Sequence, residues 1–177
     1  MAGDERLRLF CALTLSDDVL DALVRWQDDA LGGGRQVARG NLHITLAFLG
    51  GRPAADVDAV AAELQAAAAG AATPELEVRR YRETRSVGML VLGDADERAT
   101  RLAADLHGRL QRLGVYEPER RPWLPHLTVL RFRTPLRLRP PLPDLPPFSP
   151  SGAAVYMSRL RPGGAQYEIL ESVALGG

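Results

Sequence analysis

The sequence predicts an α+β protein in which two similar sheet lobes face each other. Segments with the periodicity of strands and of helices alternate along the 177 residues, and one short motif occurs at His43 and again at His126, 83 residues later. This spacing is typical of one internal duplication, because the repeats of solenoid proteins span about 20–50 residues. No long shift in composition marks a linker, so we expect residues 1–177 to form a single domain of two intertwined lobes.

The first half of the chain is expected to contain two strands and two helices. Residues 6–15 (RLRLFCALTL) alternate in character and are apolar enough for a strand. Two aspartates then open an amphipathic helix over 17–30, which a run of three glycines closes. A strand over 41–49 ends at a pair of glycines, and a proline starts an Ala-rich helix over 53–70.

The second half begins with two strands that form a hairpin, 76–82 and 86–92. A helix over 94–113 follows, because an aspartate caps it, its leucines recur every three to four residues and a glycine ends it. A Pro-rich, irregular connection over 135–150 is expected to pack over the surface. The remaining strands are expected at 126–132, 152–160 and 165–174, the last two joined by a turn at Pro162-Gly163-Gly164.

The charges are unevenly distributed, although the formal net charge is zero. Residues 1–78 contain twelve acidic residues and six arginines, whereas residues 79–177 contain ten and sixteen. The chain has no lysine, and the planar guanidinium of arginine presents paired donors that match a phosphate. We therefore expect contacts with a few phosphates, and not the extended non-specific attachment of a strongly basic protein to nucleic acid.

Nothing in the sequence indicates secretion or a membrane. The N-terminus (MAGDERLRLF) lacks a long apolar region, and charged and polar residues interrupt the Ala-rich run at 54–72. The single cysteine, Cys11, lies in an apolar segment and has no partner for a disulfide within the chain. We expect a cytoplasmic protein, a monomer, with no membrane contact.

The repeated motif is the strongest indication of function. It reads His-Ile-Thr-Leu at His43 and His-Leu-Thr-Val at His126, in a chain with three histidines and seven threonines. Side chains two residues apart in a strand share a face, so each histidine points the same way as the threonine after it, Thr45 or Thr128. Two such faces across a groove would surround one point with two imidazoles and two hydroxyls.

This set of groups suits a phosphodiester. Because an unperturbed imidazole titrates near pH 6.5, one histidine can be neutral and remove a proton from water while the other is charged and protonates the leaving oxygen. The threonine hydroxyls can donate hydrogen bonds to the phosphate oxygens. Two histidines without a third ligand nearby make a poor metal site, so we expect no metal ion. The third histidine, His107, is expected to be structural.

These residues resemble the 2H phosphoesterase superfamily, which is named for its two histidines. RLFCALTL, NLHITLAFLG and RPWLPHLTVLR are similar to the bacterial RNA 2′,3′-cyclic phosphodiesterases, also called 2′-5′ RNA ligases, and the resemblance extends from Arg6 to the closing strands. It implies a bilobal α+β fold with two pseudo-symmetric lobes and a central cleft. It also implies that RNA 3′ ends bearing a 2′,3′-cyclic phosphate are hydrolysed to a 2′-phosphate, with no metal or other cofactor.

The resemblance also implies a role for individual residues. His43 matches the general acid, the proton donor to the 3′ leaving oxygen, and His126 matches the base that accepts a proton from water. Thr45 and Thr128 match the phosphate-binding threonines, and Arg131 matches the basic residue that follows the second motif. Strand alternation argues against Arg131, because a residue five places after His126 points away from the cleft unless the strand bulges.

Three further residues near the motifs have open roles. Phe48 is four residues after Ile44 and is therefore expected on the same face of the strand. This position favours core packing over stacking on a base. Trp123, in a Pro-flanked loop, fits either role. Leu124 stands where some relatives carry a polar or basic residue, which leaves any substrate contact of that position in doubt.

Other functions remain open from the sequence alone. The same cleft could carry out reversible 2′-5′ RNA ligation or open a small cyclic nucleotide phosphate. A non-catalytic module that binds RNA 3′ ends is a different class, and the presence of both histidines and both threonines argues against it, because a binding module needs no proton-transfer pair.

Overall fold

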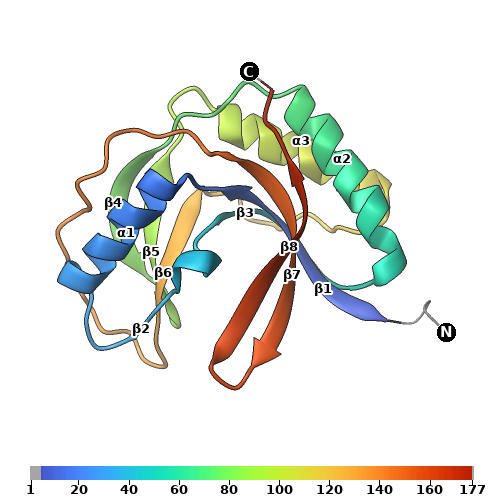
Figure 1. Cartoon of the computed structure of the whole chain (residues 1–177). Coiled ribbons are helices and arrows are strands. Elements are labelled where there is room, and N and C mark those ends of the chain that lie inside the picture. The colour runs from blue at the N-terminus through green and yellow to red at the C-terminus, as the bar shows by residue number, and fades with distance from the viewer. Residues whose placement is uncertain (1–4, 177) are drawn as a thin grey trace.

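The first sheet joins the beginning and the end of the chain. In the computed structural model, which describes residues 5–176, its order is β3-β1-β7-β8 and all its neighbouring strands are antiparallel (Figure 1). Leu9 to Leu13 in the middle of β1 are buried without alternation, as expected for an apolar central strand that is covered on both faces. The strands are β1 (Arg6–Thr14), β3 (Ile44–Pro53), β7 (Gly152–Arg161) and β8 (Gly164–Val173).

The second sheet carries the second motif on β6. Its order is β2-β6-β5-β4, again antiparallel throughout. Its strands are β2 (Arg35–Gln36), β4 (Glu77–Glu83), β5 (Val87–Gly93) and β6 (His126–Arg131). The α+β class with two facing antiparallel sheets is thereby confirmed. The two-residue strand β2 was not predicted, because it is too short to show a period.

Three α-helices flank the sheets, at Asp17–Ala30 (α1), Val57–Ala69 (α2) and Arg98–Arg112 (α3). Helix α2 contacts β7 and β8, α3 contacts β3, and α1 lies over the other sheet (Figure 1). Helices α1 and α3 therefore each pack on the sheet to which the preceding strand does not belong. One continuous hydrophobic cluster includes Leu23 of α1, Leu106 of α3, Ile44 of β3 and Leu127 of β6, so both sheets share a core.

Three predicted boundaries were wrong for local reasons. The strand expected at 41–49 begins at Ile44, after a short 3-10 helix (Arg39–Asn41), and continues to Pro53 because its last residues pair with β1. The helix expected from 53 therefore begins only at Val57, after a 3-10 turn. The helix expected from 94 begins at Arg98, because Glu97 has a left-handed conformation, although the Asp94 carboxylate accepts hydrogen bonds from the first N–H groups as a cap would.

The Pro-rich connection is irregular, as predicted, and is fixed at several points. The indole of Trp26 donates to the Pro141 carbonyl at 2.7 Å, and the carboxylate of Glu83 accepts from the backbone N–H of Leu138 at 2.8 Å. Leu76 and Phe148 form an isolated antiparallel bridge. Within residues 5–176, no helix is both long enough and apolar enough to cross a membrane.

Candidate active site

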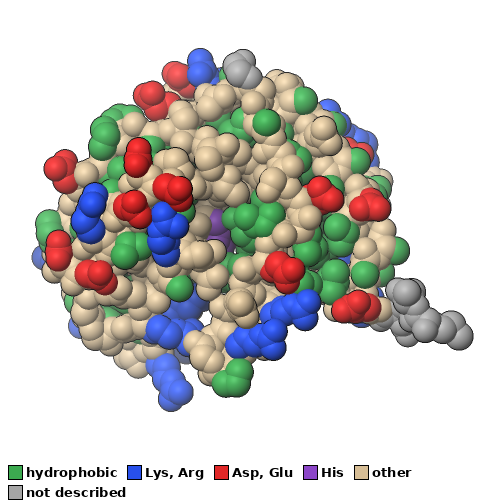
Figure 2. All heavy atoms as spheres, viewed as in Figure 1, with side chains coloured by type: hydrophobic (Ala, Val, Ile, Leu, Met, Phe, Trp, Pro, Cys, Tyr) green, Lys and Arg blue, Asp and Glu red, His purple; other side chains and the backbone are tan. Residues whose placement is uncertain are grey.

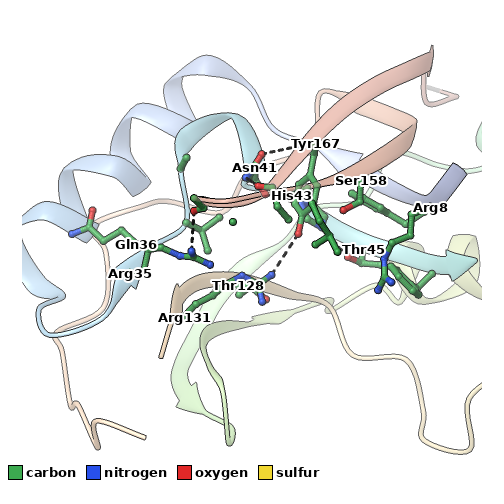
Figure 3. A pocket seen from close by; sticks show the side chains of 18 residues that line it. Arg8, Arg35, Gln36, Asn41, His43, Thr45, Thr128, Arg131, Ser158 and Tyr167 are labelled. Carbon is green, nitrogen blue, oxygen red and sulfur yellow. Dashed lines mark hydrogen bonds between the residues drawn. The ribbon is translucent and has the colours of Figure 1, made fainter. Parts of the chain in front are cut away.

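A cavity of about 600 Å³ lies between the two sheets and is lined by residues of both motifs (Figure 3). His43 and Thr45 enter it from the β3 side, and Thr128 and Arg131 enter it from β6. The hairpin of β7 and β8 forms one wall. In Figure 2, imidazole atoms are visible at the bottom of a hollow, and arginine side chains gather below it. The structure therefore brings the two motifs together around one space.

The imidazole of His43 is held in one orientation. Its Nδ1 donates to the Asn41 carbonyl at 2.7 Å, and the Thr45 hydroxyl lies 2.9 Å from Nε2. A carbonyl can only accept, so the proton of the neutral ring is on Nδ1. Nε2 of the neutral ring therefore accepts a hydrogen bond from the Thr45 hydroxyl, and it is the nitrogen that carries the second proton when the imidazole is charged.

The imidazole of His126 is held in the same way. Its Nδ1 donates to the carbonyl of Leu124 at 2.8 Å, which again lies two residues before the histidine. His126 does not itself line the cavity, but it lies close enough for its charge to act on His43. Both histidines thus adopt the tautomer that a proton-transfer pair requires.

The two histidines differ in their surroundings. The ring of His43 packs 4.9 Å from Phe10, 5.8 Å from Tyr156 and 5.3 Å from Tyr167, measured between ring centroids. Burial lowers the pKa of His43 to about 4; the Asn41 carbonyl opposes this shift, and the positive charges of His126 and Arg131 add to it. With this pKa, His43 is neutral at pH 7.

A β-bulge in each motif strand decides which later residue faces the cleft. In β3 the pairing with β1 skips Leu46 and, beyond Phe48, also Leu49; in β6 the pairing with β5 skips Val129. An extra residue reverses the alternation beyond it. The fifth residue after each motif histidine, Phe48 or Arg131, is therefore exposed and lines the cavity.

The bulges correct one prediction and remove an objection to another. Phe48 was expected to pack in the core, but the residue is 47% exposed. The guanidinium carbon of Arg8 lies over its ring, 5.1 Å from the ring centroid. The same reversal brings Arg131 into the cavity, where its Nη2 lies 3.5 Å from the hydroxyl oxygen of Tyr167.

The cavity is basic. Besides Arg131, it is lined by Arg8 and Arg35, and no Asp or Glu is among its lining residues in the described chain. None of these three guanidinium groups forms an ion pair with a carboxylate of residues 5–176. Three cations without such partners favour an anionic ligand.

Trp123 and Leu124 lie outside the cavity lining. The indole N–H of Trp123 donates to the Thr45 carbonyl at 3.0 Å, and its ring is half-buried against the core. Trp123 therefore fixes the first motif strand. The side chain of Leu124 is partly exposed. Its backbone carbonyl contributes to the site, because it accepts the hydrogen bond from Nδ1 of His126.

Several lining residues could not be found from the sequence. Arg8 and Phe10 come from β1, Arg35 from β2 and Tyr167 from β8, and none belongs to a recurring motif. Only the pairing of distant strands brings them to the cleft. In residues 5–176, no group of three His, Cys, Asp or Glu side chains is placed to hold a metal ion.

Comparisons with known proteins agree with this geometry. A sequence profile described as the 2′-5′ RNA ligase superfamily matches residues 15–157. A Thermus thermophilus protein named RNA 2′,3′-cyclic phosphodiesterase is 30% identical over 181 residues, which cover 97% of this chain and 91% of that protein.

Solved structures show the same similarity. The crystal structure of a Thermus thermophilus protein superposes with a TM-score of 0.83 at 28% identity, covering 97% of this chain and 99% of the other. E. coli LigT complexed with 3′-AMP gives a TM-score of 0.82 at 25% identity, covering 98% of this chain and all (100%) of the other.

Proposed function

Because the chain belongs to the 2′-5′ RNA ligase superfamily, we propose that it hydrolyses the 2′,3′-cyclic phosphate at RNA 3′ ends to a 2′-phosphate, without a metal ion. The similarity to a protein named RNA 2′,3′-cyclic phosphodiesterase supports a phosphoesterase. The observation that carries the specific reaction is the matched pair of imidazoles, each held through Nδ1 by the carbonyl two residues before it.

In this reaction His126 removes a proton from water, which attacks phosphorus. The bond from phosphorus to the 3′ oxygen breaks, and the proton on Nε2 of His43 goes to that oxygen, leaving the phosphate on the 2′ oxygen. Thr45, Thr128 and Arg131 donate hydrogen bonds to the non-bridging oxygens, on which charge increases in the transition state. Phe48 supplies an apolar face for the terminal base.

The lowered pKa of His43 bears directly on its role as proton donor. A neutral imidazole cannot protonate the leaving oxygen, so the ring must gain a proton when substrate binds. The cyclic phosphate carries a negative charge, which favours the protonated form of His43, offsets the positive charge of Arg131 and so raises the pKa of His43. Protonation of His43 is thus coupled to substrate binding.

The test is a short RNA that ends in a 2′,3′-cyclic phosphate, incubated with the protein in excess EDTA, with products resolved as 2′- or 3′-phosphate. Wild type should give the 2′-phosphate, and His43→Ala and His126→Ala should each lose at least about a hundredfold in kcat/KM. Loss of activity in EDTA that zinc restores, or a pH profile of kcat/KM that is flat from about pH 5 to 9, would contradict the mechanism.

The same assay separates the alternatives. A second RNA with a free 5′ hydroxyl reveals ligation as a longer product, and a cyclic mononucleotide reveals activity on small substrates. Tight binding of the RNA without turnover by folded wild-type protein would instead indicate a binding module.

A further inference from the structure

The two bulges that shape the cleft are built alike. The extra residue is Leu46 in β3 and Val129 in β6, each three places after its motif histidine, and both are buried. A bulge disrupts the regular ladder of backbone hydrogen bonds, so the carbonyl of its extra residue needs a partner from elsewhere.

In both strands a side-chain N–H from a helix donates to this carbonyl, and in β6 the backbone N–H of Val37 donates to it as well, at 3.1 Å. Nε2 of Gln27, on α1, donates to the Val129 carbonyl at 2.9 Å, and Nε2 of His107, on α3, donates to the Leu46 carbonyl at 2.6 Å. In glutamine and histidine alike, Nε2 lies three bonds from Cβ, so the two side chains reach equally far. The two halves of the molecule thus make the same bond with different residues.

Both donors are themselves held in place. Gln27 is the buried polar side chain of the core, at 1% exposure, and its Nε2 also donates to the Val37 carbonyl at 3.0 Å. The ring of His107 packs against Tyr116, with 4.8 Å between ring centroids. Such fixed donors favour one position of the carbonyl that they contact.

We propose that Gln27 and His107 are positioning residues for the cleft. Gln27 holds the bulge that turns Arg131 toward the phosphate, and His107 holds the bulge that turns Phe48 toward the terminal base. Without its bulge, each strand would return to regular alternation and point that fifth residue toward the core. The kinetic part of this proposal rests on the proposed function, whereas the binding of inorganic phosphate to the cleft does not.

The test uses methionine, which keeps the length of either side chain and removes the donor. Gln27→Met should weaken the binding of inorganic phosphate, measured by calorimetry, about tenfold or more, because a small displacement of an aligned group is costly. His107→Met should leave phosphate binding unchanged and raise KM for the RNA. His107→Gln should restore the wild-type KM, because glutamine makes this bond in the other half.

Double variants separate positioning from general destabilisation. Gln27→Met should have no further effect on phosphate affinity in an Arg131→Ala background, and His107→Met no further effect on KM in a Phe48→Ala background. Additive losses, or equal effects of both methionine variants on phosphate binding, would overturn the proposal. If Gln27→Met does not fold, Gln27→Asn, which retracts the same amide by one carbon, takes its place. If wild type binds phosphate but does not hydrolyse the RNA, the proposed function is wrong, but the effect of Gln27→Met on phosphate affinity still tests the role of Gln27.

Discussion

The two motif strands have similar backbone geometry but present different side chains to the cleft. Each histidine is held by the carbonyl two residues before it, each is followed by a threonine on the same face, and each strand bulges at the same place. Yet His43 lies among aromatic rings while His126 lies outside the cavity lining, and the residue that faces the cleft beyond the bulge is Phe48 in one strand and Arg131 in the other. The two strands thus share one backbone geometry, but one presents an apolar face to the cleft and the other a cation.

The largest expected effect would test whether the two histidines divide the proton transfers as proposed. A substrate with sulfur in place of the bridging 3′ oxygen has a leaving group that departs as a thiolate and needs no proton. On it, His43→Ala should regain at least about a hundredfold relative to wild type, whereas His126→Ala should not, since its proton acceptor is still missing. Recovery of His126→Ala instead would exchange the two roles.

The next effect concerns the cation side of the cleft. Arg131→Ala should lower kcat/KM by about tenfold to a hundredfold, because it removes a charged hydrogen-bond donor from the phosphate. Arg133→Ala is the matched control, since Arg133 is exposed, two residues away and outside the cavity lining. Equal losses in both variants would mean that only the overall charge matters.

A smaller effect is expected on the apolar side. Phe48→Ala should raise KM by about tenfold with little change in kcat, because stacking on a base is worth about 1–3 kcal/mol. Phe48→Tyr, which keeps the ring, should behave as wild type. A terminal nucleotide without a base would be hydrolysed equally well by wild type and Phe48→Ala; a persistent difference would rule out stacking.

The smallest effect is on stability, and it concerns His43, the histidine that packs among aromatic rings. The pKa of His43 is lowered to about 4, so between this value and its unfolded value near 6.5 the unfolded chain binds more protons. The contribution of His43 to the free energy of unfolding is fully present above about pH 6.5 and is lost as the pH falls toward 4. The loss is no more than about 3 kcal/mol. The fall in Tm from pH 7.5 to 5 should therefore be smaller in His43→Asn than in wild type. Equal falls in the two proteins would mean that His43 is not held neutral.

Much of this arrangement could be predicted from the sequence, because it depends on local patterns. The helix over 17–30 and the facing pair of motifs follow from periodicity and repetition. The position of Phe48 could not be predicted, because a single inserted residue reverses a strand's alternation and leaves no compositional trace. Arg8 and Tyr167 depend on the pairing of β1 with β3 and β7 and of β7 with β8, which joins distant segments. The lowered pKa of His43 arises from the same long-range packing.

Helices α1 and α3 each pack on the sheet to which the preceding strand does not belong, and this affects how the chain can fold during synthesis. The helix that supports β3 comes from the second half of the chain, and the helix that supports β6 comes from the first. In addition, β1 pairs on one side with β7, which begins only at Gly152. During synthesis, a nascent chain that has emerged only as far as α2 therefore exposes one edge of β1 and lacks the helix that covers β3. The core against each motif strand is thus completed by a helix from the other half of the chain.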